Sequence, residues 1–291
     1  MAGFAVSARR RNGAPTVIYG LLVVAVSAGS LVQHGRNPSR QAYPHDVPIA
    51  ALLAYIAADI KHHLGVSGFA THAVVDQHSV VPVGDDVPPD IAAVLGCAVL
   101  TGGGAVINAG RPTPGQAVMV VGLGGVGMAA LITALSLGEG EVIGVDSNPD
   151  KLTQSTKLGA SATYTPQDVA ELNIQAPIVI EAAGRPRAFE TALAATAPGG
   201  TTVTVGLPAP DARSSISPLA LVAGARTIIG SYLGSAVPAR DIPVFAQLWR
   251  DGKLPVEKLI SSRITLSDIN SAMDQLADGN AIRQVIIFDE K

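Results

Sequence analysis

The chain has 291 residues, about two domains of typical size, and 48% of them are hydrophobic, which is enough for a sizeable core and excludes global disorder. Basic residues number 20 and acidic residues 23, so the net charge of −3 gives no reason to expect a nucleic-acid partner. The single cysteine excludes an intrachain disulfide and a zinc site built from several cysteines of this chain, and it favours a reducing compartment.

An uncharged segment near the N-terminus, residues 16–33, follows three consecutive arginines and admits two interpretations. As a membrane anchor it is at the short end of spanning lengths and contains two glycines and two serines. Its valine and isoleucine content is equally typical of a pair of buried strands. We expect a cytoplasmic protein without membrane association, and an N-terminal anchor is the alternative.

From residue 115 onward, strand-like apolar runs alternate with helical stretches, which indicates a parallel sheet with crossover helices. Strands are predicted at residues 117–121, 141–146, 178–181 and 201–207. One helix is expected where apolar residues recur at helical spacing, a second opening at Pro149, and a third over residues 189–196. The apolar positions of the first helix are Met128, Leu131, Ile132 and Leu135. The pattern predicts an α/β doubly wound parallel sheet of the Rossmann type.

The two flanks of this unit have a different pattern. Residues 69–83 alternate and are rich in β-formers, and residues 88–99 read as a helix. The tail reads as a helix over residues 266–276 and a strand over residues 283–288. The simplest account is a second domain built from both chain ends, residues 1–98 and 233–291, with the dinucleotide domain at residues 99–232.

A glycine-rich segment, GLGGVG at residues 122–127, lies between the first predicted strand and helix and matches the dinucleotide fingerprint G-x-G-x-x-G. Gly122 permits the tight turn, Gly124 lets the backbone approach a pyrophosphate, and Gly127 lets the helix pack close to the sheet. The helix N-terminus offers amide donors to the anion. The structural alternative is a tight glycine turn that binds nothing.

An acidic residue, Asp146, ends the second predicted strand about 20 residues after the glycine segment. A carboxylate at this place binds the hydroxyls of the adenosine ribose and repels a 2′-phosphate, so NAD is favoured over NADP. The structural alternative is that Asp146 only caps the helix that follows.

The stretch from residue 62 to the C-terminus resembles the zinc-type alcohol dehydrogenases of the medium-chain dehydrogenase/reductase family. The resemblance is carried, in the family's order, by HHLGVSGFATHAVVD (62–76), LGCAVLTGGGA (95–105), VVGLGGVGMAA (120–130), VIGVDSNPDK (142–151), EAAGR (181–185), VGLP (205–208) and NAIRQVIIF (280–288). It implies that the β-rich domain is GroES-like. It also implies an NAD-linked enzyme that converts an alcohol to an aldehyde or ketone, with zinc stabilising the alkoxide.

The family pattern also implies roles for single residues. Arg185 and Arg283 match arginines along the dinucleotide, Thr101 lies beside the nicotinamide as a catalytic residue, and Cys97 is a zinc ligand. On its own, Cys97 reads as a small buried apolar residue. On spacing alone, Arg283 reads equally as the solvated end of a strand, and Lys151 equally as an exposed residue in the first turn of a helix. The remaining cofactor residues are Gly122, Gly124, Gly125, Val126 and Gly127 at the pyrophosphate, Asp146 and Lys151 at the adenosine ribose, and Val205 and Gly206 at the nicotinamide.

The sequence departs from the family where the other zinc ligands are expected. Val32 stands at the position of the first ligand, a cysteine, and valine cannot bind zinc. The Gly-His-Glu segment of the second ligand is missing, and His34 and His45 read as loop histidines. Only about a dozen residues separate residue 50 from His62, where the family has several dozen. We infer an internal deletion that leaves the GroES-like domain incomplete.

These observations support one main function and two alternatives. The main hypothesis is an NAD-dependent alcohol dehydrogenase acting on a small alcohol or aldehyde as a homodimer or homotetramer, assembled partly through a strand region at residues 231–235. The first alternative is a catalytically impaired NAD-binding remnant or interaction protein without a complete zinc site. The second is a zinc-independent activity of the quinone reductase kind.

Overall fold

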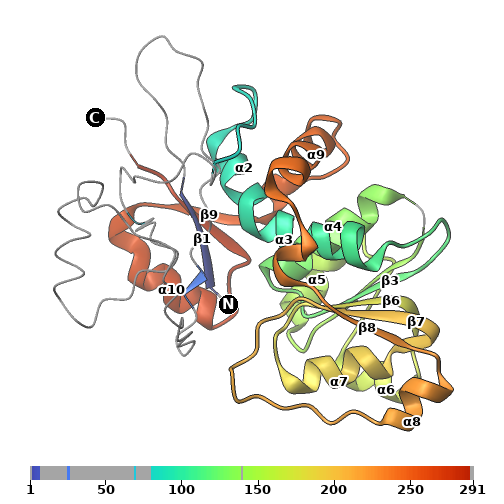
Figure 1. Ribbon diagram of the computed structural model, residues 1–291. Coiled ribbons are helices and arrows are strands. Elements are labelled where there is room, and N and C mark those ends of the chain that lie inside the picture. The colour runs from blue at the N-terminus through green and yellow to red at the C-terminus, as the bar shows by residue number, and fades with distance from the viewer. Residues whose placement is uncertain (1, 7–24, 27–68, 70–79, 139, 289–291) are drawn as a thin grey trace, which may run out of the picture.

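The computed structural model describes residues 2–6, 25–26, 69, 80–138 and 140–288 (Figure 1). Within residues 16–33 it describes only the short strand β2 (Ala25–Val26), so the choice between anchor and strands lies mainly outside the described residues. The predicted β-rich run at residues 69–83 also lies largely outside them. So do Val32 and every histidine of the chain.

The central element is a parallel sheet of six strands in the order β5-β4-β3-β6-β7-β8. From β3 the chain moves outward to one edge and then, starting at β6, outward to the other, which makes the sheet doubly wound and confirms the predicted fold class. Such sheets bind ligands at the carboxyl ends of the strands near this reversal. The strands are β3 (Val118–Val121), β4 (Val142–Val145), β5 (Ala162–Tyr164), β6 (Ala176–Glu181), β7 (Thr196–Thr204) and β8 (Thr227–Gly230).

Helices cover both faces of this sheet because its central strands are apolar on both sides (Figure 1). Val118 and Val120 belong to a core shared with α4, whereas Met119 and Val121 belong to a core on the other face, beside α6 and α7. The predicted helices are confirmed. The helices are α4 (Gly125–Leu137), α5 (Pro149–Leu158), α6 (Pro166–Glu171), α7 (Pro186–Ala194) and α8 (Pro218–Ala223).

The strand predicted at residues 201–207 differs from the observed β7 at both ends. It begins earlier, at Thr196, and it ends at Thr204. The chain leaves the sheet there because the amide groups of Val205 and Gly206 both donate to the carbonyl oxygen of Glu181.

The helix predicted at residues 88–99 continues to Gly110 as α2 (Pro89–Val94), η2 (Leu95–Val99), α3 (Leu100–Gly104) and η3 (Ala105–Gly110). Glycine is a poor helix former, but here three consecutive glycines allow close packing. A Cβ on Gly102 would lie 2.2 Å from the carbonyl oxygen of Val126 in α4. The whole stretch is long and apolar enough to cross a membrane, yet 83% of its most apolar window is buried in the protein, as in a core helix.

A second sheet, in the order β2-β1-β10-β9, joins the two ends of the chain. β1 (Ala2–Val6) pairs in parallel with β10 (Arg283–Ile286), and β10 pairs in parallel with β9 (Ile260–Ile264). This pairing brings residues from both ends of the sequence into one sheet. The predicted tail helix is confirmed as α10 (Ile269–Ala277), preceded by the short helical turn η6 (Leu266–Asp268), and the tail strand is confirmed as β10.

The strand region expected at residues 231–235 is wrong. These residues form a turn, η4 (Tyr232–Ser235), that leads into α9 (Pro238–Arg250). Leu233, Gly234 and Ser235 are all left-handed, with φ of 48°, 71° and 50°. The turn packs closely against α3, because a Cβ on Gly234 would lie 2.4 Å from the carbonyl oxygen of Leu100. The left-handed backbone brings Gly234 this close to α3, and the extended backbone of a strand would not.

We predict that Gly234→Ala lowers the free energy of unfolding by about 2 kcal/mol or more, because it adds both left-handed strain and a backbone clash. The matched control is Gly230→Ala, where φ is not positive and the new methyl group would have no neighbour within 4 Å. Urea unfolding of both variants measures the difference. An unfolding midpoint of the Gly234 variant equal to that of the wild type would contradict the described turn.

Candidate functional site

The glycine segment forms a tight turn between β3 and α4. Gly122 has φ of 94°, and a Cβ on Gly127 would lie 1.8 Å from the carbonyl oxygen of Gly122, so neither position accepts a side chain without a shift. At Gly124 a Cβ would have no neighbour within 4 Å, so the loop is open on that side. An open backbone at the N-terminus of a helix can accept a phosphate group.

Asp146 lies beside this loop, as the spacing predicts. Its Oδ2 accepts a hydrogen bond of 2.7 Å from the amide of Leu123, and its Oδ1 accepts one of 2.9 Å from the amide of Asn148. The N-cap of α5 is Asn148, whose side chain accepts from the amide of Asp150. Asp146 therefore ties the end of β4 to the glycine turn rather than serving only as the cap of α5.

Arg283, far away in sequence, also reaches the glycine loop. It is only 4% exposed, and a Cβ on Gly125 would lie 2.5 Å from the Cζ of its guanidinium group. The burial excludes the alternative interpretation of Arg283 as the solvated end of a strand. Burial lowers the pKa of Arg283, and its Nε has no hydrogen-bond partner among the residues that the structure describes. A buried cation with an unused donor is costly unless an anion pairs with it, so the loop and Arg283 together fit a pyrophosphate.

The turn before β10 lies against the start of α5. A Cβ on Gly279 would lie 3.6 Å from the Nζ of Lys151, in the first turn of α5. Lys151 is half-buried. Asp146 and Arg283 therefore contact the glycine loop itself, whereas Lys151 lies against the turn that leads into β10.

Cys97 and Thr101 lie one helical turn apart, and their side chains are hydrogen-bonded. Burial raises the pKa of the Cys97 thiol more than the charge of Arg283 and the bond to Thr101 lower it. No group of three histidine, cysteine or acidic side chains that could hold a metal occurs among the residues that the structure describes. Cys97 alone does not make a zinc site, so the described residues do not by themselves fit the metal.

A pocket of about 450 Å³ opens at the carboxyl ends of β6, β7 and β8. It brings together Arg185, Val205 and Gly206, three residues predicted for the cofactor. Glu181 also lines it, is 1% exposed and was missed by the sequence reasoning. The signal was present in the EAAGR motif, because an acidic residue at the end of a buried apolar strand needs hydrogen-bond partners.

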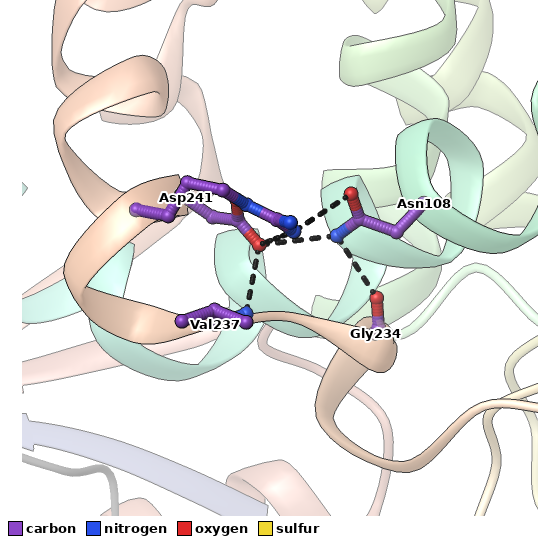
Figure 2. A network of polar contacts seen from close by, with 5 residues as sticks. Asn108, Gly234, Val237 and Asp241 are labelled. Atoms are coloured by element: carbon purple, nitrogen blue, oxygen red, sulfur yellow. Dashed lines mark hydrogen bonds and ion pairs between the residues drawn. The ribbon is translucent and has the colours of Figure 1, made fainter.

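A hydrogen-bond network fixes the segment that follows the pocket wall (Figure 2). Asp241, buried in the first turn of α9, accepts from the amide of Val237 at 2.9 Å, from the Nδ2 of Asn108 at 3.1 Å and from the guanidinium group of Arg240. The same Nδ2 donates to the carbonyl oxygen of Gly234 at 3.3 Å. The network therefore joins α9, η3 and the turn that presents Tyr232 to the pocket.

The pKa of Asp241 is lowered, first by the hydrogen bond from Arg240 and then by the bonds from Val237 and Asn108. Its carboxylate therefore stabilises the fold fully above about pH 4, the ordinary aspartate range, and loses this effect as the pH falls through the lower folded pKa. We predict that Asp241→Asn costs about 1–3 kcal/mol at pH 6 and that the difference from the wild type shrinks by pH 3.

Urea unfolding at the two pH values measures this difference. Asp251→Asn is the matched control, because the side chain of the exposed Asp251 accepts, among the described residues, only from the side chain of Gln247. A cost for Asp241→Asn that is the same at pH 6 and pH 3 would show that the carboxylate charge is not what the network uses.

Comparisons of the sequence with known proteins find similarity to dehydrogenases. The family model described as "Zinc-binding dehydrogenase" matches residues 125–250. A geraniol dehydrogenase of Castellaniella defragrans is 37% identical over 234 residues, which are 77% of this chain and 62% of the relative. Alcohol dehydrogenase 1 of Petunia hybrida is 32% identical over 241 residues, 79% of this chain and 63% of the relative. The chain thus spans less than two thirds of these relatives.

A solved structure of another alcohol dehydrogenase is also similar to this chain. The crystal structure of benzyl alcohol dehydrogenase from Acinetobacter calcoaceticus superposes with a TM-score of 0.72 at 28% identity. The superposition covers 77% of this chain and 64% of that one.

Proposed function

Because the chain belongs to the zinc-type alcohol dehydrogenases of the medium-chain dehydrogenase/reductase family, we propose that it is an NAD-dependent alcohol dehydrogenase. The alcohol becomes an aldehyde or ketone as its carbon-bound hydride passes to the nicotinamide and its hydroxyl proton is released. The relatives are named as a geraniol dehydrogenase and an alcohol dehydrogenase, and a small-molecule alcohol or aldehyde is the substrate class that we propose here.

The observation that carries the proposal is the buried Arg283 at the glycine loop. Its Nε lacks a partner within the described chain, and the loop beside it is open at Gly124. A dinucleotide pyrophosphate would pair with this cation and with the amides at the start of α4. If the glycine turn bound no anion, the buried charge of Arg283 would keep its desolvation cost without a compensating partner.

The other residues extend this cofactor site along the sheet. Asp146 and Lys151 would hold the adenosine ribose on one side of the glycine loop, and Arg185, Val205 and Gly206 would border the nicotinamide half at the pocket on the other. Thr101 would lie beside the reacting ring. When bound, NAD supplies the hydride acceptor, and the chain's own residues orient it and exclude water around it.

Cys97 is the one zinc ligand that we propose among the described residues. A catalytic zinc needs three protein ligands, so a metal bound at Cys97 would require ligands beyond the described residues. The similarity to enzymes named as dehydrogenases does not favour the catalytically impaired alternative. Zinc analysis of metal-washed protein, paired with NADH titration of the same sample, tests the metal and the cofactor separately.

We further propose a homodimer in the cytoplasm. β8 is an edge strand of the parallel sheet, and Leu219, Val222 and Tyr232 near it are strongly exposed apolar side chains, so this edge is a suitable interface. Sedimentation measures the assembly. The proposed domain boundaries are residues 99–232 for the dinucleotide domain, and residues 1–98 with 233–291 for the incomplete GroES-like domain.

We predict that Arg283→Met weakens NADH binding about 10- to 100-fold, because a charge-assisted hydrogen bond to the pyrophosphate is worth about 1.5–3 kcal/mol. Fluorescence titration of NADH measures the dissociation constant. Stability should hold or rise, since an unpaired buried charge is removed. Arg111→Met, at an exposed arginine outside the site, is the control. Wild-type affinity in the Arg283 variant would refute its assignment to the pyrophosphate.

A further inference from the structure

Glu181 is a buried carboxylate whose oxygens are both occupied by donors of the protein. Its Oε1 accepts from the amides of Ala183 at 2.8 Å and Gly184 at 2.7 Å, in the loop between β6 and α7. Its Oε2 accepts from the hydroxyl of Thr204 at 2.7 Å, at the end of β7. One side chain thus links the ends of two neighbouring strands at the pocket.

The backbone of Glu181 adds to the same link. Its carbonyl oxygen accepts from the amides of Val205 at 2.9 Å and Gly206 at 3.2 Å. The two loops then meet directly, because a Cβ on Gly206 would lie 2.1 Å from the amide nitrogen of Gly184. Glu181 therefore holds two walls of the pocket together. One wall carries Arg185, and the other carries Val205 and Gly206.

The chemistry of the site requires a carboxylate. Three donors point at the side chain of Glu181, and an ionised carboxylate is a pure acceptor with two oxygens. Glutamine in the same place could keep its oxygen on the amides of Ala183 and Gly184 only by turning its NH₂ group to the hydroxyl of Thr204, which would then accept instead of donate, and the two amide bonds would lose the charge of the acceptor. Because three donors of the protein already occupy most of the acceptor sites of this buried carboxylate, Glu181 is suited to holding the two loops together.

We infer that Glu181 is a positioning residue that sets the spacing of the two pocket walls and thereby the affinity for the nicotinamide half of the cofactor. The inference rests on the proposed NAD-dependent function. The phosphates and adenosine lie, by that proposal, on the glycine loop with Asp146 and Arg283. ADP should therefore bind independently of Glu181, whereas NADH should not.

The test compares the dissociation constants of NADH and ADP, by calorimetry, for the full chain and its variants. Glu181→Gln is expected to weaken NADH about 10- to 100-fold, as for a lost hydrogen bond to a charged group, and to change ADP by less than about twofold. The matched control is Glu171→Gln, because the exposed Glu171 on α6 accepts from Gln167 and lies outside the site.

A second pair of variants keeps the test valid if Glu181→Gln does not fold. Thr204→Val removes one donor to the carboxylate and should weaken NADH about 3- to 10-fold, within the range of a single hydrogen bond. Thr204→Ser retains the hydroxyl and should restore the affinity. A general loss of stability would not follow this pattern of loss and rescue.

The outcomes separate the inference from the proposed function. If the wild type binds neither NADH nor ADP, the proposed function fails. If the wild type binds both, and Glu181→Gln or Thr204→Val leaves NADH unchanged or weakens ADP equally, the proposed function stands and the positioning role is overturned.

Discussion

The close contact between Gly122 and Gly127 positions α4 on the sheet, and α4 in turn positions the helices packed against it. Since a Cβ at residue 127 would lie 1.8 Å from the carbonyl oxygen of Gly122, the start of α4 is fixed directly above the end of β3. α4 in turn packs against the helical stretch Pro89–Gly110, where a Cβ on Gly102 would lie 2.2 Å from the carbonyl oxygen of Val126. That stretch supports the turn at Gly234. A loop that suits a phosphate therefore also sets the packing of the core.

The architecture of the dinucleotide unit could be predicted because it depends on local patterns. Apolar strands, helices opening at proline and the glycine segment each leave a signature within a few residues. Asp146 was found in the same way, because the end of β4 fixes its distance from the glycine loop. The parallel pairing of β3 with β4 and β6 then places these features at one edge of the sheet.

Features that depend on distant contacts were not predictable from local patterns. Glycine propensity argues against a helix through residues 102–104, and only the neighbouring backbone of α4 explains why the helix continues. The left-handed turn at Leu233 exists because α3 lies against it. Glu181 gave no periodic signal, and its importance follows from donors on two separate strands. Burial of Arg283 likewise follows from the pairing of chain ends.

The parallel pairing of β1 with β10 has a consequence for how the protein matures. Residues 118–230 form a contiguous sheet unit that can fold as soon as it leaves the ribosome, since its contacts are relatively local. β1, by contrast, cannot pair until β10, more than 270 residues later in the sequence, has been synthesised. The same segment carries Arg283. A nascent chain therefore possesses the glycine loop before it possesses the cation that is buried against it.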